Sequence, residues 1–391
     1  MTPSELRASF SLASIFGLRM LGMFIILPVF TLWTQSQPGW NLELAGIAIG
    51  VYGLTQAILQ IPMGRLSDRF GRKPLLYAGL AAMAAGSFVC AASASPAGMI
   101  AGRVLQGVGA VSGVAIAFAA DLTREAQRSK AMAIIGSTIG AAFAVSFVSA
   151  PSLDQWVGIH GIFAITGSLA IAAMAVARWV VPDAPLVQRS PAAPAFSEVL
   201  KLPELLRLDF GIFTLHSVLM AMFVVTPVAL VRAGLPAAHH WWIYLGAMVA
   251  GLALMMPALA ARTVRRERPV FLAAVAVIAC GIAVLAAGLS SVAAIAVALV
   301  IFFAGFNVLE AKLPALVSRA APPEARGAAT GVYSSVQFLG TFVGSAAGGA
   351  IAQHFGFAAT LGACLLLLLA WLGVAWNMGE FVPATSSVAG R

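Results

Sequence analysis

Residues 64–76 read GRLSDRFGRKPLL, a short stretch that places five charged side chains in an otherwise apolar chain. Only 9% of the 391 residues are charged and 61% are hydrophobic, whereas a soluble domain carries about 25% charged residues. Apolar stretches close to the roughly 20 residues that cross a bilayer recur from one end of the chain to the other. The composition therefore predicts an all-α integral membrane protein.

Hydropathy divides the chain into twelve expected transmembrane helices. Residues 182–207, rich in proline, alanine and polar side chains, are the long connection, and we expect them to form a cytoplasmic linker. They separate an amino-terminal six-helix bundle, residues 1–181, from a carboxyl-terminal six-helix bundle, residues 208–391. The expected spans are 9–33, 43–64, 75–94, 96–120, 131–151, 159–181, 208–231, 241–261, 269–288, 292–316, 326–350 and 357–377.

The distribution of lysine and arginine predicts the orientation of the chain. Of the 23 basic residues, all but three lie near the chain ends or in the connections that follow even-numbered spans. Arg19 and Arg103 lie inside spans, and Arg232 lies on the other side. The positive-inside rule then places both termini in the cytoplasm. Because short basic clusters between spans report orientation, we expect no nucleic-acid partner.

The two halves of the chain repeat a pattern. Arg128 follows the fourth span and Arg326 follows the tenth, and each precedes a helix rich in small residues. Two related six-span halves are frequent among secondary transporters, whose substrate site lies between them. The sequence therefore predicts two pseudo-symmetric bundles around a shared route through the membrane.

The charged stretch lies between spans two and three and has the properties of a breakable latch. Its glycines allow the chain to turn tightly between two helices, and Asp68 can face the positive amino end of a helix that begins on this side. Arg72 and Lys73 can pair with Asp121 at the end of span four. Alternatively, the cluster only enforces topology. The expected gating residues are Gly64, Asp68, Arg69, Gly71, Arg72, Lys73 and Asp121.

This stretch resembles the signature of the major facilitator superfamily in the same connection. Gly64, Leu66, Asp68, Arg69, Gly71, Arg72 and Lys73 match it without a gap. The segments RMLGMFIILPVF at 19–30, GIAIGVYGLTQAILQIPMGRLSDRFGRKPLL at 46–76 and GVYSSVQFLG at 331–340 are similar to the YajR-like transporters of its drug:proton antiporter group. The resemblance covers the whole chain and implies transport by alternating access.

A second motif of the superfamily is similar to RVLQGVGA at 103–110. The resemblance assigns Arg103 to the motif arginine that is linked to proton transfer, whereas the alternative is that Arg103 only pairs with backbone carbonyls. Many antiporters of the superfamily carry Gly-Pro late in span five. This chain has Ala150–Pro151 there, which weakens the antiporter assignment without favouring an importer.

Ionisable residues inside the expected spans are candidates for proton coupling, because a charge at a helix centre costs about 2.5–3.5 kcal/mol on insertion scales. The expected proton-coupling residues are Glu310, Arg103, Arg19 and Asp209. Glu310 is the first choice, since burial disfavours its charged form and an approaching arginine, expected to be Arg19, favours it. Alternatively, Glu310 and Lys312 form a charged patch at the membrane surface.

His216 and Met220 lie one turn apart on span seven and raise a second possibility. His216 can titrate near neutral pH, and thioether and imidazole ligands together suit Cu(I). Some members of the superfamily that this chain resembles import copper through such pairs. The alternatives are that His216 is a hydrogen-bonded packing element and that methionines fill an irregular cavity for varied apolar substrates.

We therefore expect a proton-coupled secondary transporter of the bacterial inner membrane that exports small amphipathic organic compounds. No GxxxxGK[ST] run occurs, and we expect no cofactor, no enzymatic activity and a monomer in the lipid bilayer. A copper importer and a non-transporting receptor or scaffold on the same fold remain alternatives. The expected lining of the substrate cavity is Gln56, Gln60, His216, Met220, Asn307 and Gln337.

Overall fold

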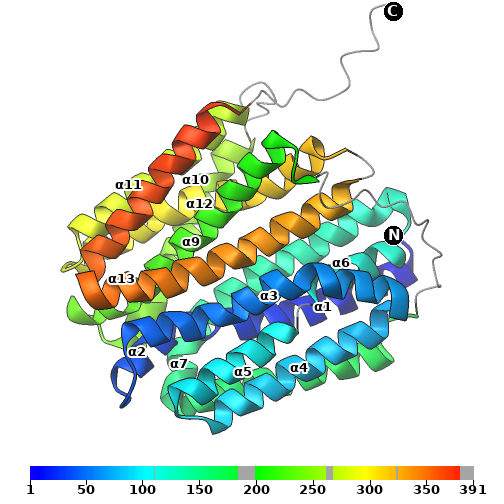
Figure 1. Cartoon of the computed structure of the whole chain (residues 1–391), viewed down its shortest axis with the longest axis horizontal. Coiled ribbons are helices and arrows are strands. Elements are labelled where there is room, and N and C mark those ends of the chain that lie inside the picture. The colour runs from blue at the N-terminus through cyan, green and yellow to red at the C-terminus, as the bar shows by residue number, and fades with distance from the viewer. Residues whose placement is uncertain (110, 184–198, 261–266, 323–324, 379–391) are drawn as a thin grey trace, which may run out of the picture.

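The computed structural model describes residues 1–109, 111–183, 199–260, 267–322 and 325–378, and these residues form helices and connections without a strand (Figure 1). The all-α fold class is thereby confirmed. The helices are α1 (Pro3–Phe24), α2 (Leu27–Gln35), α3 (Leu42–Phe70), α4 (Arg72–Ala92), α5 (Pro96–Val108), α6 (Ser112–Asp121), α7 (Glu125–Trp179), α9 (Pro203–Arg232), the short 3₁₀ helix η1 (Ala237–His239), α10 (His240–Ala260), α11 (Glu267–Ala287), α12 (Val292–Ala320) and α13 (Arg326–Trp376).

The described residues contain nine helical segments long and apolar enough to cross a membrane. Two of them, α7 with 55 residues and α13 with 51 residues, are each broken by a glycine with positive φ, Gly158 at 65° and Gly356 at 84°. Each break separates two of the expected spans, and the apolar helix α10 adds a further crossing. This arrangement is consistent with twelve spans.

Side-chain caps explain where several helices begin. Asn41 accepts a hydrogen bond from the backbone N–H of Leu44 at the start of α3, and Ser95 does the same for Gly98 in α5. Such caps satisfy N–H groups that have no partner within the helix. Helix α9 begins at Pro203, so the last residues of the expected 182–207 linker are helical; residues 184–198 of that linker lie outside the described part of the chain.

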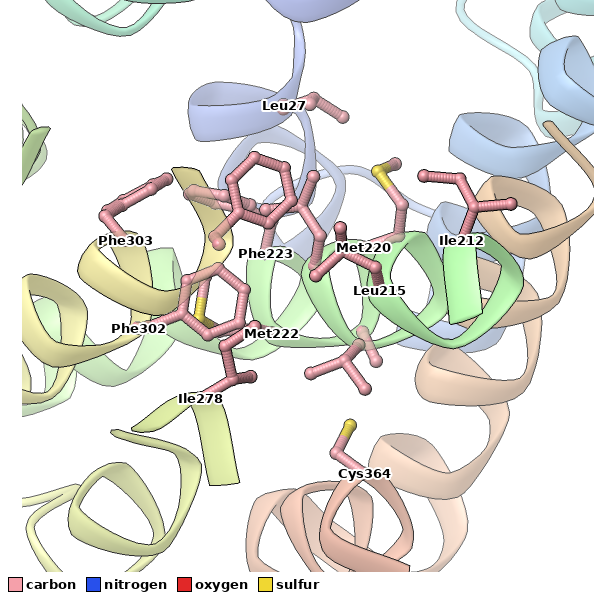
Figure 2. Packing of buried hydrophobic residues seen from close by; sticks show 14 of the residues in the cluster. Leu27, Ile212, Leu215, Met220, Met222, Phe223, Ile278, Phe302, Phe303 and Cys364 are labelled. Atoms are coloured by element: carbon pink, nitrogen blue, oxygen red, sulfur yellow. The ribbon is translucent and has the colours of Figure 1, made fainter. Parts of the chain in front are cut away.

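The helices pack in two groups (Figure 1). In the first group α1 and α4 lie against α7, and α5 lies against α3 and α4. In the second group α9 lies against α13, and α12 lies against α10 and α11. Helix α9 is the most enclosed of the candidate spans. Figure 2 shows apolar side chains of neighbouring helices around it, among them Leu27, Ile278, Phe302 and Cys364.

The closest approach between the groups joins α3 to the first half of α13 (Figure 1). A methyl group at Gly46 would meet the backbone carbonyl of Ser345, and one at Gly50 would meet the Ser345 hydroxyl and the Phe342 backbone. At Gly349 a methyl group would meet the carbonyl of Leu42. Glycine is therefore required at these positions, because any larger side chain would push the two helices apart.

We call the face that carries Met1 and the α3–α4 connection the N-terminal face, and the opposite one the far face. At the far face Gln353 Oε1 accepts a hydrogen bond from the Leu42 N–H at 3.0 Å, and His354 Nε2 lies 3.2 Å from Glu43 Oε2. Both contacts join α3 to α13. Contacts between the two groups thus gather toward the far face.

At the N-terminal face the start of α1 is fastened to the start of α7. Both carboxylate oxygens of Glu5 accept hydrogen bonds from the Arg124 guanidinium, at 2.8 and 3.1 Å, and Glu5 also accepts from the backbone N–H groups of Thr2 and Arg124. These donors, with the Arg124 side chain first, hold the pKa of Glu5 well below its usual range. The carboxylate thus remains charged in the folded protein.

Replacement of Glu5 by glutamine is expected to lower the thermal unfolding midpoint at neutral pH. Because the folded-state pKa of Glu5 is depressed, its contribution to stability is present above the unfolded-state pKa of about 4.3 and is lost as the pH falls toward the folded-state value. Thermal unfolding of the purified protein at pH 7 and at successively lower pH measures this. If the difference in thermal unfolding midpoint between the unmodified protein and Glu5→Gln stays constant below pH ~4, the prediction is contradicted.

Candidate functional site

Arg72, the first residue of α4, is the centre of the charged connection. Its side chain is 8% exposed, with one guanidinium nitrogen 2.7 Å from Asp68 Oδ1 and Nε 2.9 Å from Asp121 Oδ2. The same guanidinium donates a hydrogen bond to the Ser67 hydroxyl. The expected pairing of Arg72 with Asp121 is therefore present, and it ties the α3–α4 connection to the end of α6.

The glycines of this connection differ from each other in their structural roles. Gly71 separates α3 from α4 with φ +94° and ψ 157°, a conformation that only glycine adopts without strain. Gly64 lies inside α3, which continues to Phe70, and a methyl group there would meet nothing within 4 Å. The expectation of a turn at Gly64 is wrong, because the helix runs on past the end of its apolar stretch.

The remaining basic residues of the stretch have other partners. Lys73 lies 2.6 Å from Asp183, not beside Asp121 as expected, and so links α4 to the end of α7. Arg69 lies over the ring of Phe70, with 5.3 Å between its guanidinium carbon and the ring centroid. The charged connection therefore contacts several helix ends of the first group.

Arg103 is buried on α5 and held by backbone carbonyls. Its guanidinium donates to the carbonyl oxygens of Ala48 and Ile49 on α3, each at 3.1 Å, and to Gln106 Oε1 at 2.8 Å. It also lies 4.8 Å from the centroid of the Tyr52 ring. This geometry agrees with the alternative in which Arg103 only pairs with backbone carbonyls. Carbonyl dipoles and the face of an aromatic ring satisfy its charge.

Arg19 is buried on α1, and the structure places it away from Glu310. Its Nε donates to the carbonyl oxygen of Gly109 at 3.2 Å, and a second nitrogen donates to the Ser112 hydroxyl. Both acceptors lie at the break between α5 and α6. The expected ion pair of Arg19 with Glu310 is not formed in the described part of the chain, because the side chain points into the first helix group.

Glu310 on α12 instead lies beside His216 on α9. Glu310 Oε2 is 4.0 Å from His216 Nε2, and the Gln337 amide on α13 donates to the same imidazole nitrogen at 2.9 Å. The ring of Phe306 lies 6.1 Å from the imidazole. Three helices of the second group thus bring a carboxylate, an imidazole and an amide together inside the membrane region.

The Glu310 carboxylate has no hydrogen-bond partner for its shielded Oε2 atom within the described residues. A shielded oxygen of this kind is costly unless the group is protonated or meets water or a ligand. Lys312, two residues further along α12, lines a different hollow, beside Glu267 and Arg319. Since residues two apart on a helix do not share a face, the alternative of a common Glu310–Lys312 patch is wrong.

Tyr333 and Asp209 extend this cluster along α13 and α9. The buried Tyr333 phenol lies within electrostatic reach of both Glu310 and Asp209, and its hydroxyl has no hydrogen-bond partner among the residues described. Tyr333 precedes Gln337 by one helical turn, and Asp209 precedes His216 by two turns on the same face. Tyr333 is not among the residues predicted from the sequence, although its spacing of one helical turn from Gln337 could have indicated it.

The other expected cavity residues lie on different elements. Gln56 and Gln60 are buried on α3, and both polar atoms of the Gln56 amide lack a hydrogen-bond partner in the described structure. Asn307 is partly buried one turn before Glu310. Unpartnered buried amides are uncommon in folded proteins, so Gln56 marks a place where water or a ligand is expected to bind.

Met220 belongs to the apolar core around α9 and is 5% exposed (Figure 2). His216 faces Gln337 and Glu310 instead. Groups of three or more His, Cys, Asp or Glu side chains that could hold a metal ion are absent from the searched, described residues. The geometry therefore gives no specific support to a copper site at His216 and Met220.

An aromatic cluster joins the two helix groups between the polar cluster around Glu310 and the far face. Phe143 and Phe147 on α7 lie 6.4 and 4.7 Å from Phe223 on α9, between ring centroids. Phe147 also lies 5.3 Å from Tyr244 on α10. These residues could not be predicted from the sequence, because a single aromatic residue on an apolar helix does not indicate which partner it contacts.

A multi-pass helical protein with polar and charged groups buried inside its spans has the build of a membrane transport protein. The profile of the Major Facilitator Superfamily matches residues 12–345. The chain therefore belongs to this superfamily, and it is a membrane transporter and not an enzyme.

The chain is similar to the inner membrane transport protein YajR of Escherichia coli (strain K12), with 43% identity over 99% of this chain and 86% of that protein. It is also similar to the multidrug resistance protein MdtH of Aeromonas salmonicida (strain A449), with 24% identity over 86% of this chain and 85% of MdtH. A bacterial homolog of the human lysosomal transporter Spinster, solved in an inward-facing and occupied conformation, has the same fold, with a TM-score of 0.79, 13% identity and 98% of each chain covered.

Proposed function

We propose that this protein is a proton-coupled secondary active transporter that exports small amphipathic organic compounds across the bacterial inner membrane by alternating access. The observation that carries the proposal is the Glu310–His216–Gln337 cluster, in which the Glu310 carboxylate faces the His216 imidazole within the membrane region. Intramembrane ionisable groups of this kind are typical of proton relays. MdtH, a related multidrug resistance protein, supports the substrate class.

The cluster suggests how proton binding would be coupled to a change of state. In the neutral imidazole, Nε2 accepts the hydrogen bond of the Gln337 amide. A proton arriving at this nitrogen would require the amide to turn its oxygen toward the ring, and the imidazolium would then attract the Glu310 carboxylate 4.0 Å away. The three helices α9, α12 and α13 would shift relative to each other as this pair forms and breaks.

The orientation of the chain follows from its basic residues. The positive-inside rule supports cytoplasmic termini and a cytoplasmic N-terminal face. The contacts between the helix groups at the far face, including Gly46 against Ser345 and Leu42 against Gln353, support a state that is closed toward the other side of the membrane. The Arg72 ion pairs lie within the first group and would hold Asp68 in place. In the proposed latch, Asp68 faces the amino end of α13 while the cytoplasmic side is closed, and this contact breaks during each cycle.

Replacement of Asp68 by asparagine is expected to leave expression and folding nearly intact but to reduce transport at least tenfold. The change removes one charge from the pair with Arg72, but the Asp68 side chain is 44% exposed and Arg72 keeps its pair with Asp121, so we expect a loss of only about 1 kcal/mol in stability. Transport rates in liposomes at equal protein incorporation measure the effect. Lys130→Gln, an exposed charge change on the same face, is the control, and normal transport by Asp68→Asn would contradict the latch.

The proposed function is tested with purified protein in liposomes that hold an imposed pH gradient and an internal pH dye. Lipophilic cations and other amphipathic compounds are added one at a time, and Cu(I) is included. Substrate-induced proton movement supports the proposal. Copper flux without proton movement would favour the importer alternative, and absence of flux with every compound would favour a non-transporting receptor.

A further inference from the structure

A hollow on the N-terminal face between α11 and α12 is separate from the polar cluster around Glu310. Arg268, Lys312 and Arg319 line it together with Glu267, and the Phe271 and Leu316 side chains form its apolar part. The hollow is shallow, with an enclosed volume of about 10 Å³, so a bound group would lie at its mouth. We call these six residues the basic niche.

The charges of the basic niche are not balanced. Arg319 binds both carboxylate oxygens of Glu267, at 2.8 and 2.9 Å, so this pair is neutral. Arg268 donates to the backbone carbonyl of Trp376, which carries no net charge, and its guanidinium lies 5.8 Å from the Trp376 ring centroid. Lys312 forms neither an ion pair nor a hydrogen bond with the described residues. Two positive charges therefore remain without a carboxylate partner in the described part of the chain.

We propose that the basic niche binds the phosphate of an anionic phospholipid. Lysine and arginine bind phosphate oxygens through charge-assisted hydrogen bonds, and basic pockets between transmembrane helices bind acidic lipid headgroups. Phe271 and Leu316, 2% and 3% exposed, are buried beneath the cations and form the floor of the niche. The cations at the mouth therefore match the phosphate of a lipid headgroup.

The position of Lys312 argues for a lipid over a soluble anion. It lies inside the membrane-crossing helix α12, about two turns before the helix ends at Ala320. A long basic side chain at this depth extends its charge to the headgroup layer. Lipid phosphates are already present in that layer, whereas a soluble anion would have to leave water to reach it.

The test measures the affinity of the full chain, purified in a neutral detergent, for phosphatidylglycerol by native mass spectrometry. Phosphatidylcholine and glycerol 1-phosphate are the comparison ligands. The variants are Arg268→Gln with Lys312→Gln, the single Lys312→Gln and Lys312→Arg. The control is the double variant Lys130→Gln with Lys201→Gln, which removes two positive charges, as Arg268→Gln with Lys312→Gln does, but from exposed positions outside the niche. Thermal unfolding midpoints measured without lipid check that each variant is folded.

We expect the double variant to bind phosphatidylglycerol about 25-fold more weakly, because each basic residue near an anionic surface contributes about a factor of five. Lys312→Gln alone, which keeps the Arg268 contact with α13, should weaken binding about fivefold, and Lys312→Arg and the control should bind normally. Unchanged affinity in Lys312→Gln would overturn the proposal. Equal affinity for phosphatidylcholine, or equally tight binding of glycerol 1-phosphate, would overturn the assignment to an anionic lipid.

Discussion

Glu310→Gln is expected to abolish uphill transport driven by a pH gradient while leaving exchange down a substrate gradient intact. The glutamine side chain keeps the size of the carboxylic acid but cannot release a proton. In the proposed cycle Glu310 holds a proton while it is shielded. It releases this proton when His216, whose Nε2 lies 4.0 Å from Glu310 Oε2, becomes protonated and moves closer. Burial destabilises the charged form of the Glu310 carboxyl group, and an approaching cation stabilises it. Alternating access changes the burial of the group and its distance from the cation together.

Substrate-induced proton movement in liposomes measures this loss, with substrate counterflow as the second readout. Glu125→Gln is a matched control, because it makes the same change at an exposed position on α7 outside the cluster. Proton movement by Glu310→Gln at the unmodified rate would show that Glu310 is not the carrier. Asp209, which shares the His216 face of α9 and is 6% exposed, would then be the next candidate.

Gly46→Leu is expected to stop transport by preventing closure at the far face. A side chain at Gly46 would meet the Ser345 carbonyl on α13, which is backbone and cannot rotate away. Overpacking of this kind costs about 1–3 kcal/mol, which shifts the balance between two states by a factor of about 5 to 150. The protein would therefore accumulate with α3 and α13 apart at the far face.

Spin labels at Ser36 and Phe355, exposed positions near the far ends of α2 and of the first half of α13, measure the separation of the two groups. We expect a longer mean distance in Gly46→Leu and transport below one-tenth of the normal rate. Gly362→Leu on α13, where a methyl group meets nothing within 4 Å, is the control. An unchanged distance together with normal transport would show that closure does not depend on this contact.

Membership of the superfamily and the all-helical fold could be predicted from the sequence because both depend on local properties. Apolar stretches of about 20 residues cross a bilayer as helices, since each backbone N–H and C=O must be satisfied within the segment. Of the two motif glycines, Gly71 forms the predicted turn with φ +94°, whereas Gly64 lies inside α3. The Arg72–Asp121 pair could be foreseen because both residues lie at helix ends on one face.

The tertiary structure alone decided which buried groups meet. Arg19 contacts the α5–α6 break and not Glu310, Arg103 is satisfied by carbonyls of α3, and Glu310 faces His216. Hydropathy places a residue at a depth in the membrane but leaves the rotation of its helix open. That rotation is set by packing against neighbouring helices, where small residues such as Gly46 allow the backbones to approach closely.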